Sequence, residues 1–332
     1  MTGLSSGAEQ GRGVSHLANA SPTIVLGLRS ADATQAWTQA LSEALPHARI
    51  VPDAVDAPAA PAADYAVLWR PQPGFFARQR GLAAVFAAGA GVDWLLTDPT
   101  LPAALPIYRI EDGGMAEQMA AYCAHEVLRF HYRYDRYEAQ QRAGVWQEWP
   151  YVSPARCAVG VFGMGKMGEA IARALVALGF AVRGYSRSPR TLVGIECFDD
   201  SHGLEPFLQG AQVLVVAAPL TPATRNLFDA TRLAQLPRGA FLINVARGDL
   251  VVEEALLAAL DSGALAGAAL DVFRTEPLPR EHRFWNHPRV RITPHVAAIT
   301  VVSESARQVA HRITQLALGH TPSGLVDRNR AY

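Results

Sequence analysis

The chain of 332 residues is long enough for two domains of ordinary size, each with its own hydrophobic core. Half of the residues are hydrophobic and 18% are charged, which is typical of globular proteins and excludes a largely disordered chain. The 30 basic residues balance the 30 acidic ones, so the net charge gives no reason to expect nucleic acid or a membrane surface as a partner.

Residues 1–21 are rich in Gly, Ser and Ala and have no apolar segment long enough for a signal peptide. They are either a flexible tail or residues added by a misplaced start codon. No run of 18 or more apolar residues occurs, so we expect no membrane span. The three cysteines (Cys123, Cys157 and Cys197) have neither metal-site spacing nor an even number. The sequence therefore predicts a cytoplasmic protein with unpaired thiols and no bound metal.

Short apolar runs alternate with helical patterns in the first part of the chain. Strands are expected at Thr23–Leu28, Tyr65–Trp69 and Ala83–Phe86, with a helix at Ala33–Leu45 and a Pro/Ala-rich surface loop at Pro52–Ala63. This βαβ rhythm is typical of a parallel, flavodoxin-like sheet.

A long helical stretch, rich in aromatic and charged residues, is expected from about Gly114 to Ala143. It leads to a buried strand at Cys157–Phe162, a helix at Glu169–Leu178 and a second strand at Ala181–Tyr185. These last three elements form a βαβ unit of about 30 residues, the length that is usual for a dinucleotide-binding motif.

The turn between this strand and helix has the pattern G-x-G-x-x-G. Gly163 permits the tight turn, Gly165 lets the backbone approach a pyrophosphate, and Gly168 lets the helix pack closely on the strand. The free N–H groups and the positive dipole at the start of the helix then hold the phosphates. The alternative is a tight turn without a ligand, and Lys166 either assists binding or faces solvent. The expected cofactor contacts in this loop are Gly163, Met164, Gly165, Lys166, Met167 and Gly168.

The end of the second strand indicates which cofactor binds. An NAD site has Asp or Glu there for the ribose 2′-OH, whereas this chain has Ser186, Arg187 and Ser188, with Arg190 close behind and no acid in the window. The planar guanidinium of Arg187 can pair with a 2′-phosphate. The alternative is a solvated surface Arg. The sequence favours NADPH over NADH.

Later strands are expected at Val213–Ala217, Ala240–Val245, Gly267–Asp271 and Val290–Thr293, and a last helix at about Val302–Leu318. We therefore predict an α/β protein with two doubly wound parallel-sheet domains, a Rossmann cofactor domain being inserted in a flavodoxin-like substrate domain. The expected boundaries are 22–107 plus 299–332 for the substrate domain and 108–298 for the cofactor domain. Ligands of such sheets lie beyond the carboxyl ends of the strands, so we expect a cleft between the domains.

Three of these strand ends carry Arg247, Glu276 and His295. His295 can protonate a carbonyl oxygen as hydride reaches the carbon, Glu276 can stabilise the imidazolium, and Arg247 can hold a 2-oxo acid through its planar fork. Alone, each has a structural alternative: a core histidine, a loop acid or a turn arginine. Together, downstream of a cofactor motif, they indicate catalysis. The cofactor contacts expected at these and neighbouring strand ends are Pro219, Leu220, Val245, Ala246, Arg247, Asp271, His295 and Ala297.

Several of these segments resemble a known family. Ile243–Gly248, Leu270–Phe273 with Glu276-Pro277, and Thr293–Ala297 look like signature segments of the D-isomer-specific 2-hydroxyacid dehydrogenases. Segments similar to the glyoxylate/hydroxypyruvate reductase A branch are Gly89–Asp93, Glu111–Met119, His295–Thr300 and the ending from Val326 to Tyr332. The tail and the residues between the fingerprint glycines depart from the usual pattern.

The resemblance implies further roles. The backbone N–H groups around Gly91 and Val92 would bind the substrate carboxylate, and Trp69 would border a small substrate pocket. Family members pair as homodimers through an arm that corresponds to about 114–150, and Trp146 would reach the partner's active site. The alternatives are an ordinary strand-to-helix turn for the glycine loop and packing within one subunit for the aromatic residues of the arm.

The expected function is NADPH-dependent reduction of small 2-oxo acids, glyoxylate to glycolate and hydroxypyruvate to D-glycerate, with His295 as general acid. Two alternatives remain: a reductase of a bulkier 2-oxo acid, and a non-catalytic nucleotide-sensing scaffold on the same fold. A small pocket at Trp69 argues against a bulky substrate. The complete set of Arg, Glu and His argues against a scaffold.

Overall fold

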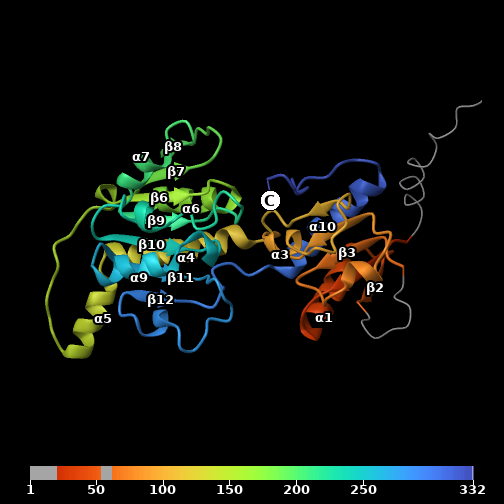
Figure 1. The fold of residues 1–332 in the computed structure, drawn as a ribbon, viewed down its shortest axis with the longest axis horizontal. Helices are drawn as coiled ribbons and strands as arrows, with labels where there is room; N and C mark the ends of the chain where they lie inside the picture. The colour runs from red at the N-terminus through yellow and green to blue at the C-terminus, as the bar shows by residue number, and fades with distance from the viewer. Residues whose placement is uncertain (1–20, 54–61, 331) are drawn as a thin grey trace, which may run out of the picture. The chain divides into compact units, whose positions relative to one another are not determined.

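The computed structural model describes residues 21–53, 62–330 and 332. Residues 1–20 of the expected tail and most of the expected loop Pro52–Ala63 lie outside this part of the chain. The chain divides into two compact units (Figure 1). Unit 1 runs to Gly114 and resumes at Thr300, and unit 2 is Met115–Ile299. Within the described residues, no helix is both long and apolar enough to cross a membrane.

Unit 1 is built on a five-stranded parallel sheet with the order β2-β1-β3-β4-β5. This is the strand order of flavodoxin-like sheets. The strands are β1 (Thr23–Gly27), β2 (Arg49–Pro52), β3 (Tyr65–Leu68), β4 (Ala84–Ala87) and β5 (Ile107–Tyr108). The helices are α1 (Ala31–Ala44), α2 (Phe75–Arg78), α3 (Asp93–Leu96) and α10 (Val302–Ala317).

The first unit boundary lies after Gly114 and not after residue 107 as expected. The reason is β5, a two-residue strand that the sequence analysis missed. It pairs with β4, and β5 and the residue after it bond to the last part of the chain: Val326 N–H donates to Ile107, and Arg109 N–H donates to Gly324. These bonds keep the segment in unit 1.

Unit 2 is built on a seven-stranded parallel sheet with the order β12-β11-β10-β9-β6-β7-β8. It is the Rossmann order with one further strand at an edge. The strands are β6 (Ala158–Phe162), β7 (Ala181–Tyr185), β8 (Ile195–Phe198), β9 (Val213–Val216), β10 (Ala240–Asn244), β11 (Leu265–Leu270) and β12 (Val290–Ile292). The α-helices are α4 (Met115–His131), α5 (Tyr134–Ala143), α6 (Lys166–Ala177), α7 (Leu204–Gln209), α8 (Ala230–Leu233) and α9 (Glu253–Asp261), and short 3₁₀ turns are η1 (Pro154–Arg156), η2 (Gly248–Leu250) and η3 (Arg283–Asn286).

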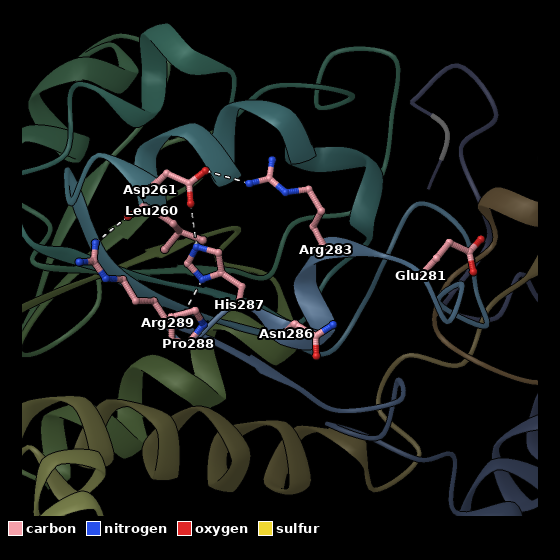
Figure 2. A pocket seen from close by; sticks show the side chains of 8 residues that line it. All are labelled: Leu260, Asp261, Glu281, Arg283, Asn286, His287, Pro288 and Arg289. Atoms are coloured by element: carbon pink, nitrogen blue, oxygen red, sulfur yellow. Dashed lines mark hydrogen bonds and ion pairs between the residues drawn. The ribbon is translucent and has the colours of Figure 1, made fainter.

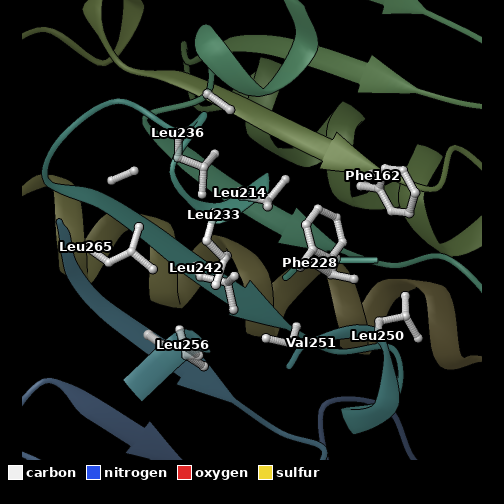
Figure 3. Packing of buried hydrophobic residues seen from close by; sticks show 14 of the residues in the cluster. Phe162, Leu214, Phe228, Leu233, Leu236, Leu242, Leu250, Val251, Leu256 and Leu265 are labelled. Carbon is white, nitrogen blue, oxygen red and sulfur yellow. The ribbon is translucent and has the colours of Figure 1, made fainter. Parts of the chain in front are cut away.

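Side chains alternate between the two faces of this sheet. On one face, Leu214 and Leu242 pack with Phe228 and with apolar residues of α7, α8 and α9 (Figure 3). On the other face, Val215 and Ile243 join the buried residues of α4 and α6. Helices cover both faces, so the central strands are buried throughout, as in other parallel sheets. The predicted fold class, two doubly wound parallel-sheet domains with the Rossmann domain inserted, is confirmed.

The helical stretch expected from about Gly114 to Ala143 consists of two helices, α4 and α5. It is interrupted because Arg133 adopts a left-handed conformation with φ of 57°, which ends α4 and begins α5. Every residue of α5 is at least partly exposed, and the helix projects from the rest of unit 2 (Figure 1). Such a helix has no buried face of its own within this chain.

Candidate active site

The glycine loop follows β6 and leads into α6. Gly163 has φ of 103°, and a Cβ added to it would lie 2.5 Å from the backbone nitrogen of Ala218. A Cβ on Gly168 would overlap the carbonyl of Gly163. A Cβ on Gly165, in contrast, would meet no heavy atom within 4 Å. The first and third glycines are therefore required by the turn, whereas the second leaves open space where a pyrophosphate fits.

Helix α6 begins at Lys166, three residues before the expected start, with Gly165 as its N-cap. Its first intrahelical hydrogen bond runs from Glu169 N–H to Gly165. The N–H groups of the turn before Glu169 thus have no partner within the helix. They point out of its positive end, as the binding of an anionic phosphate requires.

Two arginines lie near this loop. Arg190 donates to the carbonyl of Met164 and pairs with Glu169 at 3.2 Å, so it braces the loop. Arg187 is exposed just beyond β7. Ser186, which precedes it, donates its hydroxyl to the carbonyl of Ser188 at 2.7 Å. Arg190 is exposed as well, so what distinguishes it is its contact with the loop.

Met164 and Lys166 differ in their surroundings. The side chain of Met164 is buried, and an added Cβ on Gly184 would lie 2.8 Å from its sulfur. Met164 is therefore a core residue, and only its backbone lies along the loop. Lys166 is exposed at the start of α6.

Two acids that no sequence pattern indicated follow β8, the strand next to β7. Strand β8 pairs with β7, so Asp199 and Asp200 follow β8 at the same sheet edge. The hydroxyl of Tyr185 donates to Asp200 at 2.9 Å, and burial followed by this bond raises the pKa of Tyr185 to about 12. Asp199 accepts from Ser201, which holds the pKa of that carboxyl below its ordinary value. Both acids are thus engaged with neighbouring side chains.

His295 and Glu276 form a pair in unit 2. His295 Nδ1 lies 2.8 Å from Glu276 Oε2, and the other carboxylate oxygen accepts from Phe273 N–H at 3.0 Å. Burial alone would raise the pKa of Glu276, but these bonds and the charges of His295 and Arg247 lower it below 4.5. The ionised carboxylate can only accept, so Nδ1 carries the hydrogen and Nε2 remains for proton transfer.

Arg247 lies in a tight turn after β10. The buried Asn244 side chain holds this turn, accepting from Ala246 N–H at 3.1 Å and donating to the carbonyl of Arg247 at 3.0 Å. A Cβ on Gly248 would overlap the backbone of Phe273, so the turn is packed against the segment that leads to Glu276. Unit 2 therefore brings together all three residues predicted to be catalytic.

The remaining expected cofactor contacts lie beyond the carboxyl ends of the same sheet. Pro219 and Leu220 follow β9, Val245 and Ala246 follow β10, Asp271 follows β11, and Ala297 lies in the loop after β12. The Asp271 side chain is buried, and its carboxylate accepts hydrogen bonds from residues of that loop.

The expected substrate residues of unit 1 follow neighbouring strands. Trp69 follows β3, and a Cβ on Gly89 would lie 2.7 Å from its ring. Trp94 packs edge-on against Trp69 with 5.7 Å between ring centroids, and its Nε1 donates to Gly91 at 3.1 Å. The N–H groups of Gly91 and Val92 donate no hydrogen bond to other described residues. The two tryptophans thus support a loop with two open backbone donors.

Trp146, the remaining expected substrate residue, lies after α5. Its side chain is 96% exposed, and Tyr151 on the same segment is 75% exposed. Within the described residues, no apolar side chain covers the ring of Trp146.

A surface pocket lies at the opposite edge of the unit 2 sheet. It is lined by Asp261 at the end of α9 and by residues just before β12 (Figure 2). Arg283 and His287 both bond to Asp261, at 3.0 and 3.2 Å, and Arg289 donates to the carbonyl of Leu260 at 2.6 Å. Ligands of parallel sheets bind at the carboxyl ends, and this pocket lies at the amino ends of β11 and β12. Its paired charges hold η3 to α9.

Comparison with known proteins identifies the class. The profile described as "D-isomer specific 2-hydroxyacid dehydrogenase, NAD binding domain" matches residues 125–297. The chain belongs to the D-isomer specific 2-hydroxyacid dehydrogenase family of oxidoreductases, as the motifs predicted. Its cofactor is a nicotinamide dinucleotide, for which the glycine loop of unit 2 has the required space and free N–H groups.

Particular relatives share nearly the full length. Glyoxylate/hydroxypyruvate reductase A from Serratia proteamaculans is 44% identical over 301 residues, 88% of this chain and 94% of that protein. The protein of the same name from Salmonella newport is 42% identical over 303 residues, 89% and 96% of the two chains.

Two solved structures have the same fold. A family member from Xanthobacter autotrophicus Py2, in complex with NADPH and MES, is 40% identical with a TM-score of 0.89, covering 94% of this chain and 100% of that chain. An NADPH-dependent glyoxylate/hydroxypyruvate reductase from Sinorhizobium meliloti, in complex with NADP and sulfate, is 36% identical with a TM-score of 0.87 and the same coverage.

Proposed function

We propose that this protein reduces small 2-oxo acids with NADPH, glyoxylate to glycolate and hydroxypyruvate to D-glycerate. The observation that carries the proposal is the His295–Glu276 pair, at 2.8 Å, with the charge of Arg247 acting on the same carboxylate. These groups lie at the carboxyl edge of the sheet that carries the glycine loop. The names of the relatives in Serratia and Salmonella support the same choice of substrates.

In this proposal, unit 2 binds the cofactor and unit 1 contributes to substrate binding. The cofactor, when bound, supplies the hydride that adds to the carbonyl carbon. Arg247 holds the carboxylate and carbonyl of the 2-oxo acid, and the open N–H groups of Gly91 and Val92 bind the carboxylate. His295 Nε2 gives its proton to the carbonyl oxygen, which becomes the hydroxyl of the product. Glu276 stabilises the imidazolium before the transfer.

We assign the small-substrate preference to Trp69. Its ring is held against Gly89 and Trp94, so it cannot move aside without disturbing the loop that contains Gly91. A rigid indole next to the substrate would exclude large side chains. Reduction of a bulkier acid is the second candidate, and it requires that Trp69 lie outside the pocket.

The direct test is a set of initial rates with glyoxylate, hydroxypyruvate, pyruvate and phenylpyruvate, each with NADPH and with NADH. We expect fast turnover of the first two with NADPH. Turnover of phenylpyruvate alone would support the proposed reaction and refute the small substrate pocket. NADPH binding without turnover of any acid would instead support a nucleotide-sensing scaffold.

We assign the preference for NADPH to Arg187, whose exposed guanidinium would pair with the 2′-phosphate. Arg187→Ala should raise KM for NADPH by roughly tenfold, the effect of losing a charge-assisted bond, and leave KM for NADH unchanged. Arg232→Ala on α8 is the matched control, because that arginine is a surface residue paired with Asp229. Equal losses with both cofactors would refute the assignment.

We also propose a homodimer joined through the arm of residues 114–150. The exposed α5 and the almost fully exposed Trp146 support an interface, since large aromatic rings are rarely left in solvent. In the dimer, Trp146 would lie at the partner's substrate site. Light scattering would measure the mass, and Trp146→Ala should raise KM for glyoxylate. An unchanged KM and kcat for every 2-oxo acid would refute this role.

A further inference from the structure

A row of polar residues on α4 faces the segment that carries His295. The residues are four positions apart, which places them on one face of the helix. We call them the α4 row: Gln118, Tyr122 and Glu126. Each bonds to a different part of residues 291–299, which lie far away in the sequence.

The two ends of the α4 row hold the two ends of this segment. Gln118 exchanges two hydrogen bonds with the backbone of Ile299, at 2.8 and 3.1 Å. Glu126, with only 2% of its side chain exposed, accepts from Arg291 Nε at 3.0 Å. Arg291 precedes His295 and Ile299 follows it, so the helix fixes the loop on both sides.

The middle residue reaches the loop through a chain of hydroxyl groups. The Tyr122 oxygen lies 2.8 Å from Thr293 Oγ1, which lies 2.6 Å from Asp271 Oδ1. The same carboxylate accepts the N–H groups of Val296 and Ala297 at 2.8 and 2.9 Å. The Asp271 carboxylate therefore accepts the hydrogen bonds that hold residues 293–297 in place.

The number of hydrogens on each group decides which group donates in the hydrogen bonds from Tyr122 to Thr293 and from Thr293 to Asp271. The Asp271 carboxylate only accepts, so Thr293 must use its one hydroxyl hydrogen toward Asp271. Tyr122 must then donate to Thr293. Burial, opposed by the bond to Thr293 and assisted by the charges of Glu126 and Asp271, raises the pKa of Tyr122, so it stays a donor at working pH.

His295 needs this support because its backbone is strained. Its φ is 56°, in the left-handed region that residues other than glycine rarely adopt. Such a conformation persists only where the surroundings determine it. Here the N–H of His295 donates to the carbonyl of Asp271 at 2.8 Å, and the next two N–H groups donate to the Asp271 carboxylate.

We propose that the α4 row is the positioning element for His295, and that Tyr122 acts on it through Thr293 and Asp271. The inference rests on the proposed reductase function for its kinetic consequence, but not for its structural one. Tyr122 touches neither reacting atom. It is a positioning residue whose loss would leave substrate binding intact and slow proton transfer, because His295 would spend less time in the productive geometry.

The kinetic test uses the full chain with glyoxylate and NADPH. Tyr122→Phe should lower kcat about fivefold, the effect of losing one neutral hydrogen bond, and leave KM for glyoxylate unchanged. Tyr65→Phe is the control, because it removes the same atom from a buried tyrosine of unit 1. An unchanged kcat in Tyr122→Phe, with turnover intact in the wild type, would overturn the proposal.

A double-mutant cycle tests the route through Thr293. Thr293→Val removes the middle hydroxyl, so adding Tyr122→Phe to it should cause no further loss of kcat. Thr293→Ser keeps the hydroxyl and should retain most of the activity. Additive losses in the double mutant would show that Tyr122 acts by another route and would overturn the proposed chain.

Amide hydrogen exchange separates this proposal from the proposed function. In the protein without substrate, Tyr122→Phe should speed exchange at Val296 and Ala297 about fivefold and leave Val215 in β9 unchanged. If the wild type reduces no 2-oxo acid, the reductase function fails and exchange alone decides the positioning role. Unchanged exchange at Val296 and Ala297 would overturn that role, whatever the protein catalyses.

Discussion

The carboxyl ends of the two sheets differ in the chemical groups that they present. In unit 2 these are basic side chains, each fixed by a neighbour: His295 by Glu276 at 2.8 Å, and Arg247 by the turn that Asn244 holds. In unit 1 they are the backbone N–H groups of Gly91 and Val92, beside an aromatic pair.

This difference separates chemistry from recognition. A histidine side chain can gain and lose a proton, so it can take part in the reaction, whereas an arginine side chain or a backbone N–H can only bind. Losses from removing His295 should therefore appear mainly in kcat, and those from altering the Gly91–Val92 loop mainly in KM. Substitutions of His295 and Arg247 test the unit 2 side of this division.

The largest effect is expected for His295→Ala. Removing the proton donor should lower kcat by roughly 10²- to 10⁴-fold, the usual contribution of general acid catalysis, with little change in KM. His287→Ala is the matched control: it is also a histidine paired with a carboxylate, but at the amino edge of the sheet. Stopped-flow rates of NADPH oxidation would measure both. A kcat close to that of the wild type in His295→Ala would show that His295 is not the proton donor.

Arg247 should affect both binding and chemistry. Arg247→Ala should raise KM for glyoxylate and lower kcat, so that kcat/KM falls by about 100-fold, because two charge-assisted bonds to the substrate are lost. Arg247→Lys keeps the charge but not the planar fork and should recover only part of the activity. Steady-state kinetics on both variants would show this. Full activity in Arg247→Lys would mean that charge alone is sufficient.

The two later glycines of the fingerprint should separate cofactor binding from folding. Gly168→Ala should lower the free energy of unfolding by about 2–3 kcal/mol, because its Cβ would overlap the carbonyl of Gly163. Gly165→Ala should cost less than about 1 kcal/mol yet weaken NADPH binding about tenfold, since its Cβ enters only open space. Urea unfolding and calorimetric titration would measure the two. Equal stability losses would contradict the separate roles.

The elements predicted correctly from the sequence are those with buried, apolar patterns. The fingerprint strand and the central strands are almost wholly buried on both faces, so their residue types alone indicate them. The missed strands β2, β5 and β8 are short, and β2 and β8 are partly exposed at sheet edges. Pairing with a neighbour defines such strands, and their own composition does not.

The residues of the site likewise divide into those that the sequence predicts and those that it does not. Arg247, Glu276 and His295 could be named because each follows a strand whose end a pattern can locate. The contact between Tyr122 and Thr293 joins residues 171 positions apart, and no local pattern indicates it. The left-handed conformation of Arg133 likewise had no signal, since arginine is an ordinary helix residue. Long-range bonds and single backbone conformations were therefore beyond sequence reasoning.

The smallest effect expected is on the titration of Glu276. Its pKa is below 4.5 because the bonds from His295 and Phe273, with the charge of Arg247, outweigh burial. In His295→Ala the largest of these opposing contributions is lost while burial remains, so the pKa of Glu276 should rise. Carbon-13 NMR of the labelled side-chain carboxyl would follow the titration. A pKa of Glu276 that does not change would mean that His295 is not its main partner in solution.

The same shift fixes a pH dependence of stability. A carboxyl whose pKa is lower in the folded than in the unfolded state stabilises the protein above its unfolded value, and loses this contribution as the pH falls through the folded value. At neutral pH the wild type should therefore have a Glu276 contribution that His295→Ala lacks, and this difference should shrink as the pH falls through the folded pKa of Glu276. The difference should be less than about 1 kcal/mol, because a quarter of the Glu276 side chain is exposed. Urea unfolding of both proteins between pH 7 and pH 4 would detect this difference.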